Sequence, residues 1–348
     1  MTYETSVRDL SHDQSRRGPE RNRDDRTEGA MSDLVTFGES MLRLSPPGDE
    51  RLESASSLQI HVGGSESNVA VAADRLGAVS TWLSKLPRTP LGRRVVGELH
   101  QCGIKTDVSW SRRGRVGTYY VETAGEPRGS NVVYDRANSS ITTASPEELN
   151  LDRIRDARVF FTSGITPALS PELRETTTKL LQTARSAGTT TALDCNYRRK
   201  LWAPQEAQEV LTNLFPGVDV LIIAARDAKT VLGFEGDHRQ LAHKLGSQFD
   251  FTTVVVTRGS QGVLAWHDSV VHDQDAFETE TVEPIGAGDA FSGAFLARRL
   301  AGDDVQRALE YGAATAALKR TIPGDMARVT QDEVESVIAE NGSNQISR

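Results

Sequence analysis

The feature of this sequence that most constrains its fold is an alternation of short apolar runs with longer segments of helical periodicity. The runs are rich in β-branched residues and lie at 34–37, 79–83, 159–162, 190–194, 218–223 and 253–256. Such runs are typical of buried strands. Segments such as 171–187, 237–247 and 305–320 carry helical patterns. The alternation predicts an α/β fold with a mostly parallel central sheet that helices cover on both faces.

Two segments break this alternation. Residues 115–122 and 130–136 read as strands, and they flank a glycine-containing turn at 124–129. This pattern predicts an antiparallel hairpin, which has no place in a parallel core. Together with the stretch from about 41 to 62, the hairpin is expected to form a small sheet over the carboxyl ends of the parallel strands, where open α/β sheets bind ligands.

Composition excludes several classes of protein. The chain has 348 residues, of which 37% are hydrophobic and 25% charged, which is ordinary for a soluble globular protein of one large domain or two modest ones. The net charge of −8 and the absence of a basic block from the part expected to fold argue against a nucleic-acid surface. Cys102 and Cys195 are too few for a disulfide framework. No apolar run approaches the roughly 20 residues of a membrane span, so we expect no membrane contact and a cytoplasmic location.

The first 30 residues carry charges of both signs and almost nothing apolar. Such a segment cannot bury enough surface to offset the entropy of ordering it. We therefore expect residues 1–30 to be a disordered extension, with a basic interaction arm as the alternative, and one folded domain over 31–348.

A glycine-rich motif near the C-terminus carries the clearest chemistry. Gly286-Ala287-Gly288-Asp289 stands directly before an apolar helical run. The small residues leave backbone N–H groups uncrowded at a helix N-terminus, which predicts an anion site. A carboxylate inside an anion site suits a phosphoryl transfer in which Asp289 takes the proton of an attacking hydroxyl. The alternative is a glycine-rich helix start with Asp289 as a capping residue.

A second glycine motif lies far upstream. Gly63 and Gly64 precede a helical pattern at 65–76, and Gly77 is its expected stop. Asn68 falls in the first turn of this helix, where its side chain can both donate to and accept from a sugar hydroxyl. A local helix cap is the alternative role for Asn68.

In this order and at this separation, the two motifs resemble the two signatures of the ribokinase-like (PfkB) carbohydrate kinases. The resemblance runs from Met31 to about Gly324, and segments 37–46, 161–173 and 192–202 are similar to the 2-keto-3-deoxygluconate kinase branch. It implies a three-layer sandwich with a small β-sheet lid made of segments of about 41–62 and 111–137. In this family the lid often pairs with a second subunit, so a homo-oligomer through the lid is expected.

The resemblance implies ATP-dependent phosphorylation of 2-keto-3-deoxygluconate at its carbon-6 hydroxyl, in Entner–Doudoroff sugar-acid degradation. Asp289 would be the base, with Gly286, Ala287 and Gly288 as the anion hole. The residues that would contact the sugar acid are Gly63, Gly64, Asn68, Tyr119, Tyr134, Arg136 and Arg198. Two arginines suit one carboxylate, because a planar guanidinium binds a carboxylate through two parallel hydrogen bonds. Taken singly, the arginines could be solvated surface residues and the tyrosines packing residues. A kinase of fructose or ribose and a non-catalytic sugar-binding protein remain alternatives, and the sequence does not decide whether the galactose-derived epimer is accepted.

For the nucleotide, Thr257, Gly259 and Gly262 follow an apolar run and resemble the family's nucleotide-binding turn, whereas a Walker A motif is absent. ATP and Mg²⁺ are the implied cofactors, and dependence on a monovalent cation stays open. Two positions depart from the family pattern. Glu283 replaces an aspartate, and Asp227 is the acidic residue left where the family has Asn-x-x-Glu. Asp227 is the candidate metal residue, whereas His267 and His272 are expected on a solvated turn, because no further ligands stand at a coherent spacing.

Overall fold

The computed structural model describes residues 31–123 and 128–346, and the side chains up to residue 340. The expectations for residues 1–30 and for the turn at 124–127 therefore lie outside the described residues. From Met31 onward the chain forms one compact unit. No helix among the described residues is both long and apolar enough to cross a membrane.

A nine-stranded sheet forms the centre of this unit, in the order β13-β12-β11-β10-β9-β8-β1-β4-β5. The strands are β1 (Leu34–Phe37), β4 (Ser80–Pro87), β5 (Lys105–Ser111), β8 (Val159–Ser163), β9 (Thr190–Asp194), β10 (Val220–Ala224), β11 (Thr253–Thr257), β12 (Val263–His267) and β13 (Val270–Gln274). From β5 to β11 all neighbours pair in parallel, which confirms the prediction of a mostly parallel sheet. The antiparallel pairing of β11, β12 and β13 at one edge was not predicted.

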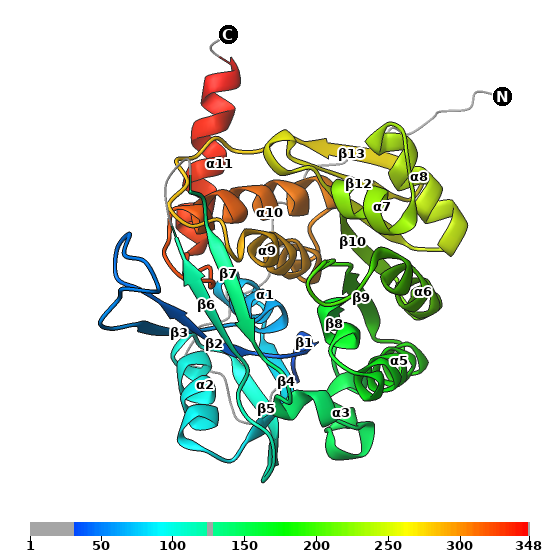
Figure 1. Cartoon of the computed structure of the whole chain (residues 1–348). Helices are drawn as coiled ribbons and strands as arrows, with labels where there is room; N and C mark the ends of the chain where they lie inside the picture. Colours follow the sequence, from blue (N-terminus) through cyan, green and yellow to red (C-terminus); the bar gives the residue numbers. More distant parts are fainter. Residues whose placement is uncertain (1–30, 124–127, 347–348) are drawn as a thin grey trace, which may run out of the picture. The chain divides into compact units, whose positions relative to one another are not determined.

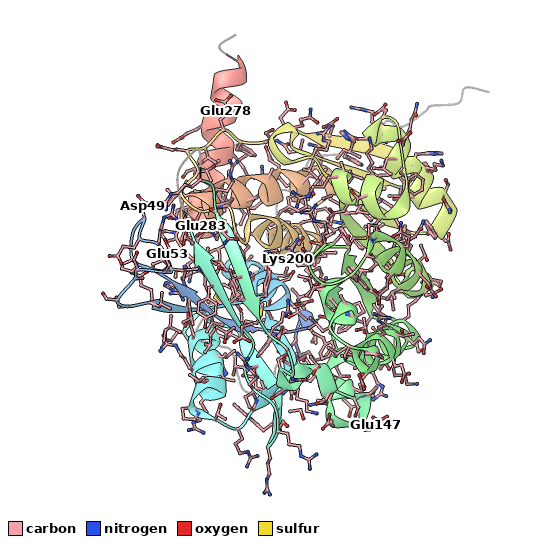
Figure 2. The ribbon with its side chains drawn as sticks, viewed as in Figure 1. Asp49, Glu53, Glu147, Lys200, Glu278 and Glu283 are labelled. Carbon is pink, nitrogen blue, oxygen red and sulfur yellow. The ribbon has the colours of Figure 1, made fainter. Side chains whose placement is uncertain are left out.

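The second, four-stranded sheet has the order β3-β2-β6-β7. Its strands are β2 (Met41–Ser45), β3 (Gln59–Gly63), β6 (Thr118–Glu122) and β7 (Asn131–Asp135). The predicted hairpin is confirmed, because β6 and β7 pair antiparallel with Tyr119 opposite Tyr134. In Figure 1 the hairpin runs diagonally across the front of the view. The connection from β2 to β3 carries the exposed carboxylates of Asp49 and Glu53 (Figure 2).

Helices cover both faces of the main sheet (Figure 1). The α-helices are α1 (Ser65–Arg75), α2 (Pro90–Gln101), α3 (Leu151–Arg155), α4 (Ile165–Ala168), α5 (Pro171–Ser186), α6 (Pro204–Leu214), α7 (Ala225–Leu232), α8 (His238–Phe249), α9 (Ala287–Ala301), α10 (Val305–Arg320) and α11 (Gln331–Ile346). Short 3₁₀ helices lie at Ser140–Thr143, Pro146–Glu148, Phe215–Gly217 and Gly259–Gln261. The helical patterns expected around 171–187, 237–247 and 305–320 correspond to α5, α8 and α10, with ends shifted by no more than a turn.

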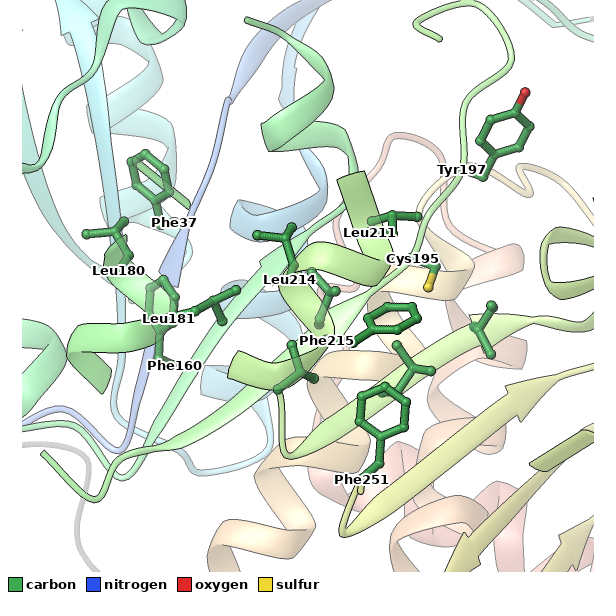
Figure 3. Packing of buried hydrophobic residues seen from close by; sticks show 14 of the residues in the cluster. Phe37, Phe160, Leu180, Leu181, Cys195, Tyr197, Leu211, Leu214, Phe215 and Phe251 are labelled. Carbon is green, nitrogen blue, oxygen red and sulfur yellow. The ribbon is translucent and has the colours of Figure 1, made fainter. Parts of the chain in front are cut away.

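Successive side chains of β1 point to opposite faces of the main sheet and belong to two separate hydrophobic cores. On β1, Val35 and Phe37 belong to the core beneath α5, α6, α7 and α8, part of which Figure 3 shows. The side chain of Leu34 points to the opposite face of the sheet and belongs to the core beneath α1, α9, α10 and α11. The main sheet is therefore the middle layer of three.

Small side chains allow α1 and α9 to lie very close together. A Cβ atom added to Gly293 of α9 would lie 2.5 Å from the carbonyl oxygen of Val69 on α1. Only a glycine permits this approach, since real Cβ atoms are not found at such distances from backbone oxygen. The close packing brings the N-terminal turns of α1 and α9 side by side, and these turns carry the two predicted glycine motifs.

Candidate active site

A cavity of about 930 Å³ opens where the N-terminal turns of α1 and α9 meet the carboxyl ends of β9, β10 and β11 and the small sheet. This is the place that the sequence predicted for a ligand. The predicted site residues that line it are Gly63, Gly64, Asn68, Tyr119, Tyr134, Arg136, Arg198, Asp227, Thr257, Gly286, Gly288 and Asp289. Ala287, Gly259 and Gly262 are not among the described residues that line it.

Asp289 lies in the first turn of α9, and both of its carboxylate oxygens accept hydrogen bonds from α1. Ser65 Oγ donates to Oδ1 at 2.8 Å, and Asn68 Nδ2 donates to Oδ2 at 2.7 Å. The residue before α9 is Gly286, whose φ of 84° is left-handed and favours glycine. The carboxylate is thus held toward α1 and the cavity.

The upstream glycine motif, Gly63 and Gly64, is shaped by close contacts as well. A Cβ atom at Gly64 would lie 2.0 Å from the carbonyl oxygen of Glu39, so a larger residue would displace the chain next to β2. The Gly64 N–H also donates to Asn68 Oδ1 at 3.4 Å. Asn68 therefore serves as a local cap with its oxygen while its nitrogen holds Asp289.

Three carboxylates face this part of the cavity, and burial disfavours the charge of each. Burial, and next the charge of Asp289, raises the pKa of Asp194 to about 7. Burial also raises the pKa of Asp289, although the hydrogen bonds from Asn68 and Ser65 oppose the shift. Burial likewise raises the pKa of Asp227, against the nearby charges of Arg226 and Arg198. Asp194 was not among the predicted site residues, but its position at the end of a strand was a signal that could have found it.

The two predicted arginines differ in their surroundings. Arg136 is ion-paired with the buried Glu39 through both Nε and Nη2, and it lies over the Tyr134 ring. Within residues 31–123 and 128–346, Arg198 makes no ion pair, and its Nη1 donates a 3.4 Å hydrogen bond to the carbonyl of Tyr197. Glu39 was missed by the sequence analysis, because it lies 97 positions from its partner. Arg198 is thus the freer of the two guanidinium groups.

The loop that carries Arg198 touches the hairpin of the small sheet. Lys200, labelled in Figure 2, donates from Nζ to the carbonyl of Val132 on β7 at 2.6 Å. On the hairpin itself the rings of Tyr119 and Tyr134 stack with their centres 6.0 Å apart. The small sheet and the loop after β9, which are far apart in the sequence, therefore both border the cavity.

A buried ion network joins the small sheet to the segment before α9. Arg43 on β2 donates to Glu283 at 2.5 Å and to Asp325 at 2.7 Å. Tyr119 on β6 donates its hydroxyl to the second oxygen of Asp325. Asp325 also lines the cavity. Sequence reasoning missed Arg43 and Asp325, which lie 282 positions apart.

The predicted nucleotide turn lies at the end of β11. Thr257 borders the cavity, and Gly259 and Gly262 both have left-handed φ values, of 61° and 83°. A Cβ atom at Gly262 would lie 2.1 Å from the carbonyl oxygen of Gln274, so this glycine also has a packing role against β13.

The described residues contain no group of three or more His, Cys, Asp or Glu side chains that could hold a metal ion by themselves. His267 and His272 lie on the β12–β13 hairpin, where His267 Nδ1 is 2.8 Å from Thr253 Oγ1. Asp194 and Asp227 face the same cavity, and their mutual charge repulsion favours a cation beside them. Mg²⁺ is commonly held by one or two carboxylates plus substrate phosphates, and this pair fits that requirement.

Comparison with known proteins identifies the family of this chain. The model of the pfkB family carbohydrate kinases matches residues 31–331. A 2-dehydro-3-deoxygalactonokinase of Haloferax volcanii is 58% identical over 307 residues, which are 88% of this chain and 96% of the relative. The crystal structure of a 2-dehydro-3-deoxygluconokinase from Thermotoga maritima, 35% identical, superposes with a TM-score of 0.84 over 89% of this chain and 99% of its own.

A putative ribokinase II from E. coli, solved in complex with ATP and Mg²⁺, is 21% identical and shares the fold, with a TM-score of 0.81 over 89% of this chain and 100% of its own. The family match covers most of the chain, and the fold is the ribokinase-like one that the two glycine motifs predicted. The chain belongs to the PfkB family of carbohydrate kinases.

Proposed function

We propose that this chain transfers the γ-phosphoryl group of ATP to the terminal, carbon-6 hydroxyl of 2-dehydro-3-deoxygalactonate. The observation that carries the proposal is the 58% identity to a kinase named for this acid, over nearly the whole of both chains. The sequence analysis predicted the gluconate epimer, for which the Thermotoga maritima structure is named. That epimer is the second candidate, and both are 2-keto-3-deoxy sugar acids.

Asp289 is the proposed base. Its two oxygens are held by Ser65 and Asn68 at the border of the cavity, where a substrate hydroxyl would reach the carboxylate. The hydroxyl oxygen attacks the γ-phosphorus, the bond from that phosphorus to the ADP oxygen breaks, and the hydroxyl proton passes to Asp289. The raised pKa of Asp289, caused by burial, makes it a stronger base than an exposed aspartate.

The turn from Gly286 to Gly288 is the proposed anion hole. Backbone N–H groups at the start of α9 and the positive end of the helix dipole favour the negative charge of the transferring phosphoryl group. Gly286 and Gly288 border the cavity beside Asp289, so donors and base lie next to the same space.

Arg198 is the proposed principal partner of the substrate carboxylate, with Arg136 as the second. Arg198 lies on the cavity without an ion pair among the described residues, whereas Arg136 shares its charge with Glu39. A guanidinium group binds a carboxylate through two parallel hydrogen bonds, and a neutral sugar offers no such partner. This supports a sugar acid over fructose or ribose.

Magnesium, which accompanies ATP in the structure of the putative ribokinase II, would be held here by Asp227 and Asp194. It supplies positive charge that neutralises the phosphates during transfer. Thr257, at the end of β11, is the proposed contact of the nucleotide, and Gly259 and Gly262 shape the turn that follows it.

The experiment is a substrate panel measured as ADP release: both epimeric acids, fructose and ribose, each with ATP and Mg²⁺. We expect kcat/KM for either acid to exceed that for the neutral sugars by about 100-fold or more, because a neutral sugar would leave the half-buried Arg198 without an anionic partner. We also expect the galactonate epimer to be used at least as well as the gluconate epimer. Better turnover of fructose or ribose than of both acids would contradict the proposal.

A further inference from the structure

A lysine ammonium group lies buried directly behind the proposed anion hole. Lys319, in the last turn of α10, has an exposed fraction of 0%. Its Nζ donates to the carbonyl oxygen of Ile322 at 3.0 Å and to that of Glu283 at 3.3 Å. Glu283 lies three residues before Gly286, so the ammonium group donates to the backbone segment that leads into the proposed anion hole.

The same segment is fastened to α10 through its backbone. The N–H groups of Val282 and Glu283 donate to the carbonyl of Arg320 at 2.8 and 2.9 Å. Further along, a Cβ atom at Gly286 would lie 1.9 Å from the carbonyl oxygen of Asp325. The anion hole is therefore packed against the end of α10 and the segment 321–325. Lys319 donates hydrogen bonds both to the segment before the anion hole, at Glu283, and to the segment after α10, at Ile322.

The charge of Lys319 is costly in this position. A buried ammonium group loses the hydration that it has in water, and two carbonyl oxygens replace only part of it. The carboxylates of Glu283 and Asp325 lie nearby, but both already accept hydrogen bonds from Arg43. A methionine side chain would fill a similar volume without the desolvation cost, so packing alone does not account for a lysine here.

We propose that Lys319 is a positioning residue, whose ammonium group fixes the Glu283 carbonyl and thereby aims the N–H groups of Gly286 to Gly288 at the transferring phosphate. The inference rests on the proposed function, in which this turn is the anion hole. Donors held in place before the reaction stabilise the transition state, and a small displacement of such donors is expensive in rate. The role predicts a loss of kcat with little change in KM.

The ammonium group of Lys319 also has a pKa within the pH range in which turnover can be measured. Burial lowers the pKa of Lys319 to about 8, although the carboxylates of Asp325, Glu283 and Asp289 oppose the shift and Arg43 adds to it. Below this pH the group is charged and holds the Glu283 carbonyl. As pH rises through about 8 the charge is lost, so kcat should decline to a lower plateau.

The test compares Lys319→Met with Lys85→Met. Lys85 is the control, because it is also buried, with 6% exposed, and donates to the Thr143 carbonyl and to the Glu148 carboxylate, away from the cavity. We expect Lys319→Met to lower kcat by roughly 10- to 100-fold with KM changed less than about threefold, and to show no alkaline decline. Lys85→Met should keep both the wild-type kcat and the decline, with thermal melts confirming that each variant is folded.

A folded Lys319→Met with kcat within about twofold of wild type, or with the wild-type alkaline decline intact, would overturn the inference. Lys319→Arg is the second variant, since its charge does not titrate in this range, and retention of the decline in it would overturn the inference equally. The wild type is assayed first on the substrate panel. Failure to phosphorylate either acid would count against the proposed substrate, and the Lys319 comparison would then use the substrate that the panel identifies.

Discussion

Asp289 accepts two hydrogen bonds from side chains of α1, and its carboxylate does not cap its own helix, α9. Its proposed role is therefore that of a base and not of a helix cap. Asp289→Asn keeps the size of the side chain but cannot take a proton, so kcat should fall by about 100-fold or more while ATP binding stays unchanged. The measurements are steady-state turnover and calorimetric ATP titration. The control is Asp268→Asn, an exposed aspartate on the β12–β13 turn, and turnover of Asp289→Asn close to that of this control would remove Asp289 from the mechanism.

Substitution of Arg198 tests whether the substrate is a sugar acid. Arg198→Lys keeps the positive charge but loses the planar pair of donors, so KM for the sugar acid should rise about tenfold to a hundredfold. The matched control is Arg199→Lys, the exposed neighbour in the same loop that also borders the cavity. An unchanged KM in Arg198→Lys, or an equal rise in the control, would show that Arg198 does not bind the carboxylate.

At the scale of elements, Arg43 and Tyr119 connect β2 and β6 to Glu283 and Asp325. Arg43→Met would leave two buried carboxylates without their cation, a change that typically costs about 3 to 5 kcal/mol. Arg51→Met is the control, because Arg51 is 55% exposed and its contact with Glu53 is worth about 1 kcal/mol or less. Denaturant unfolding measures the free energy of unfolding of both variants. A loss of stability in Arg43→Met no greater than in the control would contradict the buried network.

The elements with strong periodicity could be predicted from the sequence, and the contacts between them could not. The strand at Leu34–Phe37 and the helix at Val305–Arg320 lie where the apolar patterns placed them. The antiparallel β12 and β13 were missed. The apolar run of β12 is short, so its pattern does not distinguish a strand from a helix, and the edge strand β13 mixes polar and apolar residues.

The same limit applies to the site. The glycine motifs, Asn68 and Asp289 were found because their residue types and spacing are local signals. Glu39, beside Arg136, and Lys319, behind Glu283, act through partners that only the tertiary packing brings near. A buried lysine in a helix has no local signal in sequence, since the same residue on an exposed face would fit the pattern equally well.

For the molecule as a whole, we predict that residues 2–30 are dispensable for folding and turnover. The family match starts at residue 31, and β1 is an interior strand of the main sheet, paired with β4 on one side and β8 on the other. Deleting residues 2–30 should leave the melting temperature and turnover unchanged within error, whereas a deletion through Phe37 should prevent folding. Light scattering on the variant that lacks residues 2–30 measures its mass and so tests whether it forms the homo-oligomer predicted to assemble through the small sheet. A loss of activity or a changed mass after removal of residues 2–30 alone would show a role for that segment.

The identity of the product tests the proposed function directly. Full-length protein is incubated with ATP, Mg²⁺ and 2-dehydro-3-deoxygalactonate, and the phosphorylated product is examined by phosphorus–proton correlation NMR. We expect one new phosphate ester, coupled to the protons of carbon 6, in equal amount to the ADP released and formed at least about 100-fold more slowly with Asp289→Asn. An ester on another carbon, or ADP release without any sugar phosphate, would contradict the proposed function.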